Sequence, residues 1–148
     1  MSRLTDSWPP DEKPGIGRAL SGLTNTMGVL AGVLAAEDGL PIAVRVRTDQ
    51  DGDVWSAAAA AMGRIGRKVL RRLGKGELEV GVFDTDKYRL LVRAVRLGYL
   101  LAVCDPEANI GLITMEMEAA AEALDRAATA LVPSAVADPA YWKGAAHP

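Results

Sequence analysis

The chain has 148 residues, of which 49% are hydrophobic and 24% charged, a composition typical of one globular domain with room for a core. Its formal net charge of -2 at pH 7 provides no overall attraction to nucleic acid or to an anionic membrane. A single cysteine, Cys104, and a single histidine, His147, exclude an intrachain disulfide and argue against a metal site built from several cysteines or histidines.

The N-terminal segment, residues 1–14, is rich in proline and charge and predicts a flexible arm. It has no apolar core of signal-peptide length, and no apolar run in the chain approaches the ~20 residues that span a bilayer. We therefore expect a cytoplasmic protein without direct membrane insertion.

A short helix and a hairpin are predicted at the start of the domain. Apolar side chains recur at helical spacing in residues 15–27, and residues 29–36 are then apolar at odd and even positions alike. A strand with that pattern is buried on both faces and belongs in the middle of a sheet. Asp38-Gly39 favours a tight turn. The alternating segment that follows carries a proline and two arginines on its polar face, which is typical of an edge strand.

The segment 54–73 predicts a long helix with three distinct faces, and Asp51 or Asp53 can cap its start. The stripe expected to face the core is apolar and consists of Val54, Ala58, Met62, Ile65, Val69 and Leu73. A second stripe, almost free of side chains, consists of Ala59, Gly63, Gly66 and Leu70. The third stripe is basic and consists of Arg64, Arg67, Lys68, Arg71 and Lys75.

The two glycines of the second stripe require an explanation, because each costs about 1 kcal/mol relative to alanine inside a helix. Close approach of another backbone would provide it, either from a strand of the same sheet or from the same helix of a second subunit, and we expect the second. The basic stripe has no carboxylates one turn away on its own helix. It is therefore either a solvated face or a contact for an acidic partner.

Three further strands are predicted after the glycines at 74 and 76 end the long helix. Residues 77–83 and 88–95 alternate between apolar and polar, and residues 99–104 are apolar on both faces. Short turns separate the three segments, which indicates an antiparallel meander.

The last helix is predicted over residues 110–131, with Asn109 near its cap, and residues 133–148 are expected to form a tail. The domain then spans residues 15–132. Its fold class is α+β: a three-layer sandwich in which one long helix covers one face of a five-stranded antiparallel sheet and two helices cover the other. The strand at 77–83 has an open edge beside the glycine-containing helix. We expect a two-fold interface there, formed by Ala59, Gly63, Gly66, Leu70, Glu77, Glu79 and Gly81.

The sequence resembles the Roadblock/LC7 domain family over residues 16 to 131, nearly the whole domain. The motifs that carry the resemblance are Gly28-Val29, the hexapeptide DGLPIA at 38–43, the Ala-rich start of the second helix at 56–61, and Asn109-Ile110-Gly111. The family includes the gliding-motility GTPase regulators of bacteria and the dynein roadblock light chains.

The resemblance implies a non-enzymatic homodimer that regulates or scaffolds a Ras-like small GTPase, with no cofactor, no metal and no catalytic residue. Paired second helices and the adjoining strands would form the platform. Its GTPase contacts would be Trp55, Arg64, Arg67, Lys68 and Arg71.

Three other functions are open at this stage. One is an adaptor that binds a protein partner without regard to nucleotide. Another is an enzyme with Cys104 as nucleophile, which we do not expect, since a small apolar residue in a central strand is the ordinary interpretation. The third is nucleic-acid binding by the basic stripe, which the acidic net charge and the 5% aromatic content disfavour. The acidic turn at 49–53 lacks the closing glutamate of a calcium loop.

Overall fold

The computed structural model describes residues 4–6, 14–47 and 50–131. In chain order the elements are β1 (Leu4–Asp6), α1 (Pro14–Thr24), β2 (Val29–Ala35), β3 (Pro41–Arg47), α2 (Gly52–Leu73), β4 (Val80–Asp84), β5 (Arg89–Val95), β6 (Gly98–Cys104) and α3 (Ile110–Leu131).

All the strand pairings are antiparallel, and the strands lie in the order β1-β3-β2-β6-β5-β4. β2 and β6 occupy the middle of the sheet and β4 lies at an edge, as predicted. The other edge differs from the prediction, because residues 4–6 of the expected N-terminal arm pair with β3 as a sixth strand. The rest of that arm and the tail at 133–148 lie outside the described residues.

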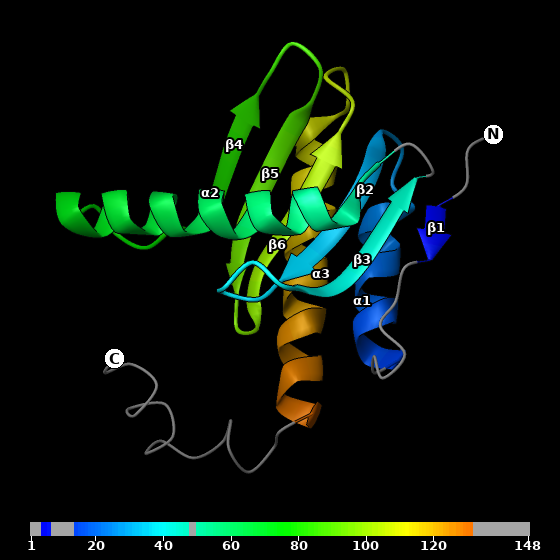
Figure 1. Ribbon diagram of the computed structural model, residues 1–148, viewed down its shortest axis with the longest axis horizontal. Helices are drawn as coiled ribbons and strands as arrows, with labels where there is room; N and C mark the ends of the chain where they lie inside the picture. Colours follow the sequence, from blue (N-terminus) through cyan, green and yellow to red (C-terminus); the bar gives the residue numbers. More distant parts are fainter. Residues whose placement is uncertain (1–3, 7–13, 48–49, 132–148) are drawn as a thin grey trace.

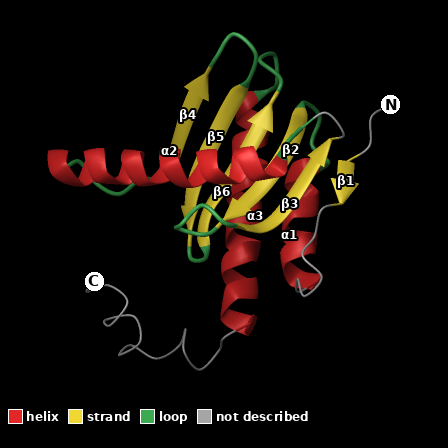
Figure 2. Ribbon diagram, in the orientation of Figure 1, coloured by secondary structure: helices red, strands yellow, loops and turns green. Residues whose placement is uncertain are grey.

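Helices cover both faces of the sheet, which confirms the three-layer α+β fold (Figure 2). α2 packs on one face, across β2, β3, β5 and β6, while α1 and α3 lie side by side on the other (Figure 1). Each face has its own cluster of buried apolar side chains. In the part of the chain that is described, none of the helices has the length and hydropathy needed to cross a membrane.

Local hydrogen bonds set the start of α2 and the turn between β2 and β3. Asp51 caps α2, since its carboxylate accepts from the backbone N–H groups of Asp53 and Val54 at 3.1 and 3.4 Å. In the turn, Gly39 has a φ of 90° and the N–H of Leu40 donates to Asp38 Oδ1 at 3.1 Å. The turn therefore has a fixed shape beside α2.

The rotation of α2 about its axis is the main departure from the sequence prediction. Its buried residues are the small ones, Ser56, Ala59, Ala60 and Gly63. The apolar stripe that was expected to face the core lies largely in solvent: Ile65 is 64% exposed, Val69 50% and Leu73 62%. Val54, at the start of the helix, is 59% exposed as well. The prediction of a core-facing apolar stripe is therefore wrong at Val54 and over the C-terminal half of α2.

The ring of Tyr99 explains this rotation. Tyr99 stands on β6 and is 1% exposed, and its ring lies directly beneath Gly63. A Cβ atom built on Gly63 would lie 2.2 Å from Tyr99 Cδ1, so that only glycine allows the helix to approach the sheet this closely. Ala59 and Gly63 thus contact a strand of their own sheet, the first of the two alternatives that the sequence left open.

The two glycines of α2 should respond differently to alanine. Gly63→Ala should lower the free energy of unfolding by about 1–3 kcal/mol, because the new methyl group would overpack the site against Tyr99. At Gly66 the nearest atom to a new Cβ is Leu78 Cδ2 at 3.5 Å, an ordinary contact. Gly66→Ala should therefore leave the stability unchanged or raise it by up to about 1 kcal/mol through helix propensity. Urea unfolding of both variants at a protein concentration that keeps the chain monomeric measures the difference. Equal effects of the two substitutions would contradict the close contact between Gly63 and Tyr99.

Candidate functional site

The C-terminal half of α2 extends past the β4 edge of the sheet (Figure 1). Gly74 ends the helix in the left-handed conformation, with its N–H bonded back to the carbonyl of Arg71. We call the exposed side chains Ile65, Val69 and Leu73 of this overhang the apolar strip. They are spaced at four-residue intervals and so form one continuous row along the helix.

The free edge of β4 is the second feature of this region. Among the described strands β4 pairs only with β5, so the backbone groups on its other side have no strand partner. Phe83 is 42% exposed and lies opposite Leu90, a residue of the cluster beneath α2, which puts Phe83 on the α2 side of the sheet. Gly81 belongs to this strand, whereas Glu77 and Glu79 are exposed just before it.

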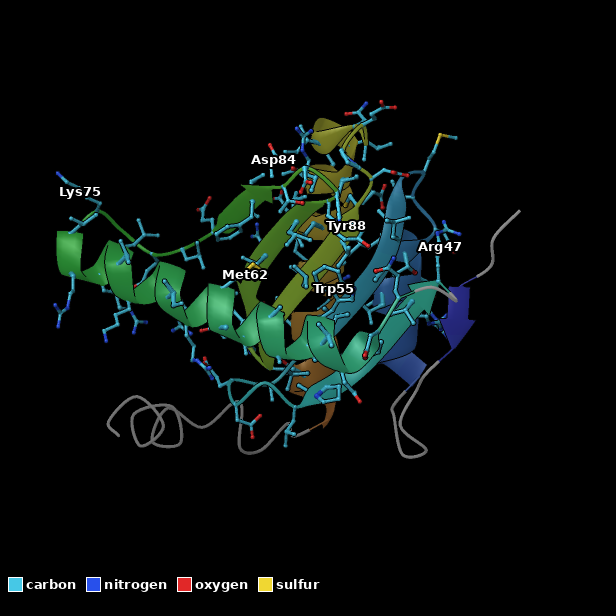
Figure 3. The ribbon with its side chains drawn as sticks, turned by 45° about the horizontal axis from the view of Figure 1, so that its top comes forward. Arg47, Trp55, Met62, Lys75, Asp84 and Tyr88 are labelled. Carbon is cyan, nitrogen blue, oxygen red and sulfur yellow. The ribbon has the colours of Figure 1, made fainter. Side chains whose placement is uncertain are left out.

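Trp55 does not lie with the basic residues. It packs against Tyr88 with the ring centroids 5.4 Å apart and the planes at 87°, and its Nε1 donates to Gln50 Oε1 at 2.9 Å. Figure 3 shows this pair where α2 crosses the sheet, with Lys75 at the far end of the overhang. Nine residues separate Trp55 from Arg64, which places the two on roughly opposite sides of a helix. The structure therefore splits the predicted GTPase contacts into two separate groups.

Four of the predicted contacts do come together on the flank of α2 that faces the β2–β3 turn. They line a shallow hollow of about 390 Å³, which we call the basic groove; its residues are Glu37, Arg64, Arg67, Lys68, Arg71, Arg72 and Tyr99. Sequence reasoning missed Arg72, Glu37 and Tyr99. Arg72 lies one turn beyond Lys68, which was a usable signal, whereas only the fold brings Glu37 and Tyr99 to this helix.

Arg67 is the cation of the groove that is bonded to the side chains of both Glu37 and Tyr99. Its Nη1 donates to Tyr99 Oη at 3.0 Å and to Glu37 Oε1 at 2.8 Å, and its guanidinium carbon lies 5.9 Å from the centre of the Tyr99 ring. The Tyr99 hydroxyl donates in turn to Glu37 Oε2 at 3.2 Å. The hydrogen bond to Tyr99, together with the nearby carboxylate, raises the pKa of Arg67 above its ordinary value. Arg67 therefore ties α2 to the turn and to β6.

Cys104 lies at the end of β6 in the cluster beneath α1 and α3, fully buried. Burial raises the pKa of its thiol to about 12, so the thiolate is not formed at neutral pH. Within the described residues no group of three or more His, Cys, Asp or Glu side chains is arranged to hold a metal ion.

Comparisons with known proteins find relatives by sequence and solved structures with the same fold. An uncharacterized protein of Methanocaldococcus jannaschii, MJ1340, is 29% identical over 107 residues, which cover 72% of this chain and 94% of the relative. Among solved structures, MglB of Myxococcus xanthus superposes with a TM-score of 0.73 at 16% identity over 81% of this chain and 99% of MglB. A Roadblock/LC7 domain from Streptomyces avermitilis gives a TM-score of 0.68 at 25% identity over 76% of this chain and 96% of that domain. The Roadblock/LC7 domain family matches residues 16–105, and this chain belongs to that family.

Proposed function

We propose that this protein is a non-enzymatic, cytoplasmic homodimer that regulates or scaffolds a Ras-like small GTPase. The observation that carries the proposal is the exposed apolar strip beside the free edge of β4, on a member of a family whose domains serve as regulatory platforms. The runner-up is an adaptor that binds its partner irrespective of nucleotide.

The exposure of the apolar strip supports a dimer in which a second copy of the chain packs over these side chains. The strip consists of three large aliphatic side chains in a row, each at least half exposed. Burying apolar surface stabilises a complex by about 25 cal/mol per Å², so covering this strip would favour association. The overhang of α2 reaches past the sheet edge that β4 leaves unpaired among the described strands. A two-fold axis at that edge would pair β4 with β4 and lay each overhang along the other α2.

This arrangement revises the expected interface. Ala59 and Gly63 are left out, because the sheet of their own protomer already covers them. Gly66 and Leu70 stay in, since they lie on the overhang and are only partly buried. Gly81 stays with the free edge of β4, and Glu77 and Glu79 flank it. The apolar strip, Ile65, Val69 and Leu73, is added.

The GTPase contacts are revised in the same way. Arg64, Lys68 and Arg71, with Arg72, are proposed to face the GTPase, while Arg67 supports them from within the groove. Trp55 is omitted because its ring is engaged by Tyr88. Through these cations the protein would act on the GTPase by binding it.

A single charge in the apolar strip should break the dimer. Ile65→Asp should shift sedimentation from dimer to monomer, with at least a tenfold weaker association, or about 1.4 kcal/mol, since a carboxylate would have to be buried. The matched control is Met115→Asp on α3, because Met115 is 68% exposed and Ile65 64%. Met115→Asp should leave the dimer intact. A monomeric parent protein, or equal effects of the two variants, would contradict the proposed interface.

The regulatory function can be tested with a Ras-like GTPase encoded beside this chain. We expect the GTP-loaded form to bind more tightly than the GDP-loaded form, and the rate of GTP hydrolysis in single turnover to change and saturate as this protein is added. The Ile65→Asp variant should lose the effect if the dimer is the platform. Equal binding of both nucleotide forms with an unchanged rate would favour the adaptor, and no binding to a competent GTPase would contradict both.

A further inference from the structure

The basic groove concentrates positive charge on a chain that is acidic overall. Five cations and one carboxylate line it, while the formal net charge of the whole chain is -2. Like charges one helical turn apart destabilise a helix slightly. An arrangement of this kind is therefore better suited to a bound anion than to the free helix.

The cations of the groove divide into a fixed floor and an open rim. Arg67 is held by Glu37 and Tyr99, and Arg64 donates to the backbone carbonyl of Glu37. At the rim, Arg71 Nε lies 3.4 Å from Glu77 Oε2, an exposed and weak pair. Neither Lys68 nor Arg72 makes a hydrogen bond or ion pair within the described part of the chain, so their charges are available to a ligand.

The linear arrangement of the cations indicates what kind of anion fits the groove. Arg64, Lys68 and Arg72 follow one another at four-residue spacing, a row roughly 12 Å long at 1.5 Å per residue. A compact anion such as phosphate needs donors that converge on one point, and a row does not provide this. An extended anion with charges about one helical turn apart would meet all three cations.

We propose that the basic groove docks an acidic segment of a partner protein, with carboxylates repeating along it at about the spacing of the row. The proposal rests on the proposed function in taking the GTPase as the partner that carries this segment. A protein is favoured over a nucleic acid because the only aromatic ring of the groove, Tyr99, is buried and offers no surface for base stacking.

The direct test uses a fluorescently labelled helical peptide that carries glutamate at every fourth position, and its glutamine counterpart. The glutamate peptide should bind the full-length protein, with an affinity that falls as salt is raised, and the glutamine peptide should not. Lys68→Glu/Arg72→Glu should weaken binding at least about tenfold, because two attractive contacts become repulsive.

The control changes the net charge by the same amount elsewhere. Arg18→Glu/Arg126→Glu alters two exposed cations of α1 and α3 and should bind the peptide nearly as the parent does. Both double variants should unfold at the urea concentration of the parent, since all four side chains lie at the surface. Equal weakening by the two variants would overturn the proposal, because net charge alone would then explain the binding.

Further arms separate this proposal from the function on which it rests. If the glutamate peptide binds but the GTPase does not, the proposed function fails, while the assignment of the groove to an acidic protein segment stands. If the GTPase binds the parent and Lys68→Glu/Arg72→Glu equally, the groove proposal fails and the function stands. Tighter binding of a single-stranded oligonucleotide or of pyrophosphate than of the glutamate peptide would also overturn it.

Discussion

The contact between Gly63 and the Tyr99 ring determines which side chains of α2 lie at the surface of this protein, where other molecules can bind them. The ring fills the space above β6, and only a helix face without side chains can close over it. The contact fixes the rotation of α2, since turning the helix would drive larger side chains into the same space. Once the small residues face the sheet, the apolar strip must point away from it, and the basic stripe lies along the flank of α2 that faces the β2–β3 turn.

The two outward stripes have different surroundings and therefore different uses. The apolar strip runs along the overhang toward the free β4 edge, where a second protomer can cover it. The basic stripe borders the β2–β3 turn, whose Glu37 neutralises only part of its charge. One helix thus provides the core contact, the proposed subunit contact and the proposed partner contact, and a change in its rotation would alter all three.

Much of the fold could be predicted from the sequence, because strands with apolar residues on both faces have only one place in a sheet. The central positions of β2 and β6 follow from that pattern, and the edge position of β4 follows from the alternation of apolar and polar residues in its segment. The rotation of α2 could not be obtained in the same way, since the small stripe and the apolar stripe are both uncharged and adjoin one another. Deciding between them requires knowing that Tyr99 lies beneath position 63, a contact over 36 positions of sequence that no local pattern encodes. β1 is too short to give a pattern, whereas the separation of Trp55 from the arginines was present in helical geometry alone.

Hydrogen exchange can be measured at two protein concentrations, one above and one below the dissociation constant of the dimer, to locate the surface through which two copies of the chain associate. It monitors the amides of every element without altering any side chain. We expect self-association to slow exchange in the C-terminal half of α2 and in β4, and to leave exchange in α1 and α3 unchanged. Protection that does not depend on concentration, or that appears instead on α1 and α3, would contradict the proposed interface.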